Sequence, residues 1–177
     1  MADSEPAVLL IAGSPSDLDL VLRSQEMLDR LQIRSEIRVQ SAHRTPEAAA
    51  RSASDAERDG FDVIIAFAGM AAHLAGVCAA HTLLPVIAVP VASGALGGVD
   101  AALACLQMPP GTPLAAVAID GARNASLLAA RILAVREPAL RAKLREIAAE
   151  DLERYDEANV ASEIEKRKQA RRAKAGR

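Results

Sequence analysis

The amino-acid sequence predicts a three-layer α/β/α domain built on a five-stranded parallel sheet. Short aliphatic or β-branched runs alternate with longer Ala-rich stretches of helical period, which is the pattern of parallel strands joined by crossover helices. A chain of 177 residues has room for one domain with a substantial core.

The expected elements follow one another along the chain. Residues 35–39 alternate polar and apolar side chains, which favours an outer strand. Five strands with helices between them most simply give the strand order of a flavodoxin-like sheet. The other expected strands cover 7–12, 63–67, 86–89 and 114–118, and the expected helices cover 18–31, 45–59, 71–80 and 124–135, with a mobile loop and a short helix within 94–113.

The chain changes character after residue 136. Residues 137–177 are rich in acidic and basic side chains, so we expect a solvated helical extension, or one that lies across a partner subunit. The catalytic domain would then span 1–136 and the extension 137–177. The extension ends in a basic tail, for which a solvated tail is favoured over a contact with RNA or a membrane. Its basic residues are Lys166, Arg167, Lys168, Arg171, Arg172 and Lys174.

The composition argues against several kinds of partner. A net charge of −2, with one Tyr and two Phe, argues against a general nucleic-acid binder. No apolar run reaches the ~18 residues that span a bilayer, and the acidic residues 1–6 do not resemble a signal peptide. Cys78 and Cys105 do not form a disulfide framework. We therefore expect a cytoplasmic protein with no nucleic-acid or membrane partner.

Three loops with polar side chains are predicted to meet at one edge of the sheet. Ligands of doubly wound domains bind beyond the carboxyl ends of the strands, and the first three strands each end in such a loop. In the first loop, Ser14 suits a helix N-cap and Pro15 the first helical position. The loop either only starts a helix or seats a phosphate on the amides near Gly13. Asp17 would repel a phosphate and suits ribose hydroxyls better.

The second loop is Ser41-Ala42-His43-Arg44-Thr45-Pro46. Arg44 is a permanent cation suited to a phosphate, and His43 can exchange a proton near neutral pH. Together they indicate an enzyme that holds an anionic substrate and moves a proton on it. The alternative is a helix start at Thr45 and Pro46 with a structural histidine.

The third loop, residues 68–76, is rich in small residues. Ala68 and Gly69 would let a ligand approach the backbone closely. Tight helix–sheet packing is the alternative, but packing does not require His73. His81 has no polar neighbours of this kind and is assigned a structural role. The three histidines lack the paired spacing of a metal site, and no dinucleotide or P-loop motif is present, so neither a metal nor a cofactor is expected.

Five segments of the chain form a recognisable set, namely Gly13–Asp17, Ser41–Pro46, Ala71–Leu74, Leu84–Ile87 and Gln107–Pro109. Together they resemble the class I N5-carboxyaminoimidazole ribonucleotide mutase family of purine biosynthesis. The match runs in order from about residue 7 to residue 135. The resemblance implies a flavodoxin-like subunit of a homo-octamer with active sites between subunits, and an isomerase that needs no cofactor. Its substrate would be an aminoimidazole ribonucleotide whose carboxyl group migrates as CO₂ from the exocyclic nitrogen to ring carbon C4.

The resemblance also implies roles for individual residues. His43 would be the general acid and base, protonating the nitrogen and later removing the C4 proton. The 5′-phosphate would be held by Ser14, Ser16 and Arg44, and the ribose hydroxyls by Asp17. The remaining substrate-binding residues would be Gly13, Ser41, Ala42, Ala68, Gly69, His73 and Leu74, and a neighbouring subunit would lend Gln107, Met108 and Pro109.

The chain departs from the family pattern at several positions. Met70 and Ala88 stand where glycines are usual, and Ala75 stands for a proline. Ala101 and Ala104 replace serines. The loss of these two hydroxyls leaves open how polar the pocket for the migrating carboxyl group is, and hence where the CO₂ comes from.

Two other functions therefore remain as alternatives. One is direct carboxylation of 5-aminoimidazole ribonucleotide by CO₂, although the class that does this usually lacks the histidine found here as His73. The other is a non-catalytic module that binds FMN or another nucleotide, which would leave His43 without a role.

Overall fold

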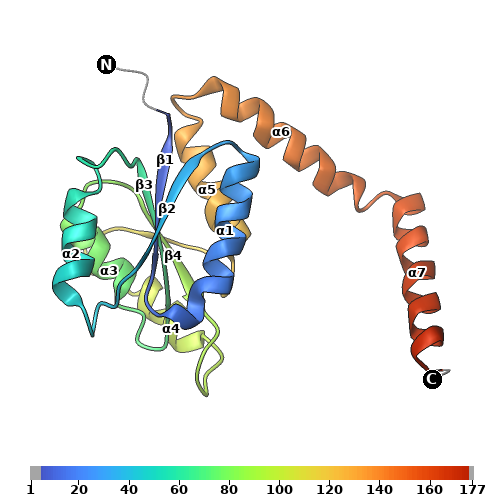
Figure 1. Ribbon diagram of the computed structural model, residues 1–177, viewed down its shortest axis with the longest axis horizontal. Helices are drawn as coiled ribbons and strands as arrows, with labels where there is room; N and C mark the ends of the chain where they lie inside the picture. The colour runs from blue at the N-terminus through green and yellow to red at the C-terminus, as the bar shows by residue number, and fades with distance from the viewer. Residues whose placement is uncertain (1–4, 176–177) are drawn as a thin grey trace.

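The computed structural model describes residues 5–175 and contains a five-stranded parallel sheet in the order β2-β1-β3-β4-β5 (Figure 1). This is the predicted flavodoxin-like order, and every neighbouring pair is parallel. The strands are β1 (Ala7–Ala12), β2 (Arg34–Val39), β3 (Val63–Gly69), β4 (Val86–Val91) and β5 (Ala115–Ala116).

Helices cover both faces of the sheet and give it two apolar cores. Successive side chains of β1 point to opposite faces, so Leu10 packs in one core and Leu9 in the other. Both faces of β1 and β4 are buried, which explains their continuous apolar sequences. One core is closed by α1 (Leu18–Arg30) and α5 (Ala122–Leu133), and the other by α2 (Pro46–Asp55), α3 (Leu74–His81) and α4 (Val99–Leu106).

The fifth strand is shorter than the predicted 114–118. The N–H of Val117 donates to the carbonyl of Ala88 at 3.1 Å, so Ala88 directs its backbone groups toward β5. Pro90 lies two residues further along β4 and faces the same side. Because proline has no N–H to donate, the next bond of this ladder cannot form. The sheet pairing of β5 is therefore confined to Ala115–Ala116.

The helix after β3 begins three residues later than predicted. Gly69 extends the strand by pairing with Val91. Met70 then adopts a φ of 55°, a left-handed conformation that turns the chain sharply. Residues 71–73 cross the end of the sheet before α3 starts at Leu74. Helix α2 ends at Asp55, four residues earlier than predicted, because residues 56–60 form turns, and α5 starts two residues earlier than predicted.

The extension after residue 136 forms two helices rather than one. These are α6 (Pro138–Glu153) and α7 (Glu157–Ala175). Leu140 and Ile147 of α6 are buried in the core beside α1 and α5, so α6 belongs to the body of the domain. Helix α7 lies apart from that body (Figure 1).

The predicted basic tail lies in α7. Its residues Lys166, Arg167, Lys168 and Arg172 are exposed. The side chains of Arg171 and Lys174 and the expected acidic start at residues 1–4 lie outside the described part of the chain. Within residues 5–175, no helix combines the length and the apolar character needed to cross a bilayer.

Candidate active site

The carboxyl ends of the first four strands border one cavity of about 360 Å³. The three loops singled out in the sequence form most of its wall, and Ser93 after β4 completes it. The structure thus brings the predicted substrate-binding residues and His43 together at one site. The lining residues are Gly13, Ser14, Ser16, Asp17, Ser41, Ala42, His43, Arg44, Ala68, Gly69, Met70, Ala71, Ala72, His73, Leu74 and Ser93.

The turn after β1 presents two hydroxyl groups and one carboxylate to the cavity. Ser14 caps a short 3₁₀ turn, since its Oγ accepts a hydrogen bond from the N–H of Ser16 at 3.3 Å. The hydroxyl of Ser16 lies 2.8 Å from Ser14 Oγ and 3.1 Å from Asp17 Oδ1. Gly13 rests against β3, where a Cβ would lie 3.2 Å from the carbonyl oxygen of Phe67. The turn can therefore sit directly over the strand end.

Asp17 is a buried carboxylate in this turn, with only 8% of its surface exposed. Burial raises the pKa of Asp17 above its ordinary value, and the hydrogen bond from Ser16 opposes this effect. A desolvated carboxylate gains from hydrogen-bond donors, which the hydroxyls of a sugar supply.

The wild-type protein should lose stability relative to an Asp17→Asn variant as the pH rises from about 4. Because burial raises the folded-state pKa of Asp17, the folded protein holds this proton more tightly than the unfolded chain does. This stabilisation is complete below the unfolded pKa and is lost as the pH rises through the folded pKa. Asn is neutral throughout. Urea titrations of both proteins at several pH values measure the difference, and curves that stay parallel would contradict the assignment.

The turn after β2 is held by its own polar groups. Ser41 Oγ accepts hydrogen bonds from the N–H groups of His43 and Arg44 at 3.3 and 3.2 Å. Thr45 Oγ1 accepts one from the N–H of Ser41 at 2.9 Å, and Pro46 then starts α2. The side chains of His43 and Arg44 are exposed at the cavity. Within residues 5–175 no ion pair involves Arg44, so its charge is available for an anion.

His43 and His73 form a hydrogen-bonded pair across the cavity. Their Nε2 and Nδ1 atoms are 2.8 Å apart, and the two rings meet edge to face at 67°. One of these nitrogens must carry the shared proton while the other accepts the bond. The pair can therefore both deliver and take up a proton. His81 differs, because its Nδ1 lies 2.9 Å from the carbonyl oxygen of Val77 in its own helix, in keeping with a structural role.

The turn after β3 supplies the small residues of the wall. A Cβ at Gly69 would lie 2.0 Å from Ser93 Oγ and 3.2 Å from the carbonyl oxygen of Val91, so a larger residue would not fit there. Met70, one of the departures from the family pattern, lines the cavity and is 60% exposed.

The other departures lie away from the cavity. Ala75 of α3, Ala88 of β4 and Ala101 of α4 are buried in the core between the sheet and these helices, and Ala104 packs against that core. The hydroxyls that Ala101 and Ala104 lack would not face this cavity. The segment Gln107–Pro109 does not line it either; instead, Met108 lies against α3, with its Cε 3.4 Å from where a Cβ of Gly76 would stand.

Ser93 is the cavity residue that the sequence reasoning missed. It follows β4 as directly as the other loops follow their strands. The rule that ligands bind beyond the carboxyl ends of the strands would have identified it if applied to the fourth strand.

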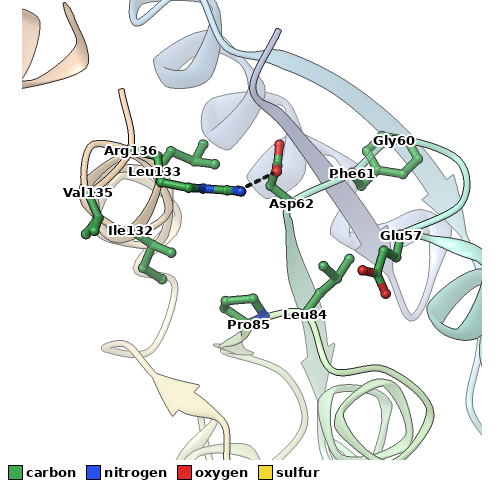
Figure 2. A pocket seen from close by; sticks show the side chains of 10 residues that line it. All are labelled: Glu57, Gly60, Phe61, Asp62, Leu84, Pro85, Ile132, Leu133, Val135 and Arg136. Carbon is green, nitrogen blue, oxygen red and sulfur yellow. Dashed lines mark hydrogen bonds and ion pairs between the residues drawn. The ribbon is translucent and has the colours of Figure 1, made fainter. Parts of the chain in front are cut away.

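A larger cavity of about 540 Å³ lies at the opposite end of the sheet (Figure 2). Its walls come from the starts of β3 and β4 and from the end of α5. Two of its charged groups, Asp62 and Arg136, are paired with each other at 3.0 Å, and the third is the carboxylate of Glu57. It contains no histidine and no cysteine, the side chains that ordinarily titrate closest to neutral pH.

Neither thiol belongs to the site. Burial raises the pKa of Cys78 to about 12 and also raises that of Cys105, so both stay protonated. Within residues 5–175, no group of three His, Cys, Asp or Glu side chains is placed to hold a metal ion.

A doubly wound sheet with a free guanidinium and paired imidazoles at its carboxyl edge defines an α/β protein whose site is suited to a small anionic ligand and to proton transfer. Residues 7–154 match the family model described as AIR carboxylase. The chain belongs to this family.

Curated relatives and solved structures agree with this assignment. The chain is 49% identical to the N5-carboxyaminoimidazole ribonucleotide mutase of Pyrococcus abyssi, over 84% of this chain and 85% of the relative. It is 50% identical to the mutase of Mycobacterium tuberculosis, over 81% and 82% respectively. The crystal structure of Treponema denticola PurE superposes with a TM-score of 0.78 at 27% identity, covering 89% of this chain and 98% of that one.

Proposed function

We propose that this chain is an N5-carboxyaminoimidazole ribonucleotide mutase, an isomerase of purine biosynthesis that yields 4-carboxy-5-aminoimidazole ribonucleotide. The observation that carries the proposal is the contact of 2.8 Å between His43 and His73 in a cavity that also contains the free Arg44. The relatives of about 50% identity support the same reaction.

The substrate fits the distribution of charge around the cavity. Arg44 and the hydroxyls of Ser14 and Ser16 bind the 5′-phosphate, because a cation and several donors suit a phosphate dianion. The neighbouring carboxylate of Asp17 accepts hydrogen bonds from the ribose. The aminoimidazole ring then lies toward the small residues after β3 and toward His43.

The reaction moves one carboxyl group and needs one proton carrier. His43 protonates the exocyclic nitrogen. The bond between this nitrogen and the carboxyl carbon then breaks, and CO₂ is released beside the ring. The lone pair of the resulting amine makes C4 nucleophilic, so C4 forms a bond to the CO₂ carbon. His43 then removes the C4 proton. A single imidazole can do both because its pKa ordinarily lies near neutral pH. The walls raise the effective concentration of the CO₂.

Comparing two substrates tests the reaction. Purified protein is given either the carbamate, N5-carboxyaminoimidazole ribonucleotide, or 5-aminoimidazole ribonucleotide with bicarbonate. The mutase assignment expects turnover of the carbamate at bicarbonate concentrations too low to support carboxylation of the amine. Turnover of the amine alone would overturn the assignment and indicate a direct carboxylase.

We also propose that the chain assembles into a cytoplasmic homo-octamer whose sites lie between subunits. Support comes from a row of exposed apolar side chains on and before α4, which water would solvate poorly. The segment Gln107–Pro109 follows this row and would reach the cavity of a neighbouring subunit. The row comprises Leu96, Val99, Leu103 and Leu106, each more than half exposed.

Light scattering should give a mass about eight times the chain mass of 18.5 kDa. A Leu103→Glu substitution should lower that mass, because burying a carboxylate in an apolar interface is costly. It should reduce turnover in parallel, since the neighbour's loop is lost. A monomeric wild-type protein with full activity would contradict the assembly.

A further inference from the structure

One hydroxyl group on the cavity wall has no hydrogen-bond partner in the protein. The Oγ of Ser93 is buried, yet no atom of residues 5–175 donates to it or accepts from it. A buried hydroxyl without a partner is energetically costly, so folded proteins rarely keep one. The position of Ser93 on the cavity wall suggests that the missing partner is a ligand atom.

The other serine hydroxyls of the wall already have protein contacts. Those of Ser14 and Ser16 contact each other, and Ser41 Oγ accepts two backbone N–H groups. Ser93 Oγ is different, because it faces the Cα of Gly69, where a Cβ would lie 2.0 Å away. Because Gly69 has no side chain, this hydroxyl can pack directly against the backbone of β3.

The sheet order places Ser93 at the far end of the site from the phosphate-binding groups. Arg44 follows β2, Ser14 follows β1, and Ser93 follows β4, in a sheet ordered β2-β1-β3-β4. A ribonucleotide with its phosphate beside Arg44 would extend its base toward β3 and β4. The group carried by that base is then the part of the ligand that approaches Ser93.

We propose that the Ser93 hydroxyl donates a hydrogen bond to an oxygen of the migrating carboxyl group and retains the released CO₂ until C4 captures it. This inference rests on the proposed mutase function. A hydroxyl donor matches a carboxylate, which only accepts hydrogen bonds. Ser93 also supplies polarity that Ala101 and Ala104 do not, since both lie away from the cavity.

A Ser93→Ala variant tests the proposal through the fate of the CO₂. The substitution removes Oγ without adding volume, and Oγ has no protein partner to leave unsatisfied, so the fold should be as stable as in the wild type. With the carbamate as substrate, we expect formation of the C-carboxylated product to fall by about 10- to 100-fold. The fraction of substrate released as free amine and CO₂, corrected for the reaction without enzyme, should rise.

The matched control is Ser54→Ala. The hydroxyl of Ser54 donates to the carbonyl of Arg51 on the exposed side of α2, away from the cavity. This variant should therefore give C-carboxylated product and free amine in the same ratio as the wild type. If the wild type is active and Ser93→Ala gives the same ratio of product to free amine, the role of Ser93 is overturned and the mutase function stays intact. A wild type that cannot convert the carbamate would overturn both.

Discussion

Replacing His43 with Asn should lower the rate of turnover by about 10²- to 10⁴-fold, the usual contribution of a positioned general acid–base group. Asn retains a polar side chain that can hydrogen-bond to His73, but it cannot carry a proton to the substrate. Binding of the ribonucleotide should change little, because the proposed complex assigns the phosphate and the ribose to other residues. Steady-state kinetics together with calorimetric titration of the product would separate the two effects.

His81→Asn is the matched control for this experiment. His81 lies at the end of α3 and contacts only the carbonyl of Val77 among the described hydrogen bonds. The same chemical change there should leave turnover close to that of the wild type. Full activity in His43→Asn would remove His43 from the reaction and leave the His43–His73 contact without a catalytic meaning.

Replacing Arg44 with Ala should weaken binding of the ribonucleotide by about 10- to 100-fold, because hydrogen bonds to charged groups are the stronger kind. The free Arg44 is the cation that the site offers to the phosphate. The loss should appear mainly in KM and in the dissociation constant of the product. It should also shrink at high salt, since part of the attraction is electrostatic.

Arg51→Ala provides the comparison for Arg44. Arg51 lies on the exposed side of α2, outside the cavity lining, so its removal changes the net charge equally without changing the site. An unchanged affinity in Arg44→Ala would show that the phosphate binds elsewhere. Equal losses in both variants would indicate a general charge effect rather than a contact with Arg44.

The sheet could be predicted from the sequence because its strands are distinctive. Residues 7–12 and 86–89 are continuous apolar runs, as expected for strands buried on both faces, and residues 35–39 alternate as an outer strand should. The strand order followed from the alternation of strands and helices. Two of the boundaries that differed, the start of α3 and the end of β5, depend on single backbone features, namely the left-handed Met70 and the missing N–H of Pro90.

The convergence of the three loops could also be predicted, because parallel strands place their carboxyl ends at one edge. The contact between His43 and His73 could not, since the two residues are 30 positions apart and meet only through the fold. Ser93 was missed because a lone serine after a strand has no distinguishing pattern. Its significance depends on the missing hydrogen-bond partner, which only coordinates reveal.

The two edges of the sheet have a consequence for solubility during folding. An open strand edge can pair with another chain and start aggregation. Here β5 offers only two paired residues, and Pro90 blocks extension of the ladder beside it. The other edge, β2, carries Arg34, Glu36 and Arg38. A strand of another chain that paired with β2 would have to accommodate these charges. Strand-to-strand polymerisation is therefore disfavoured at both edges.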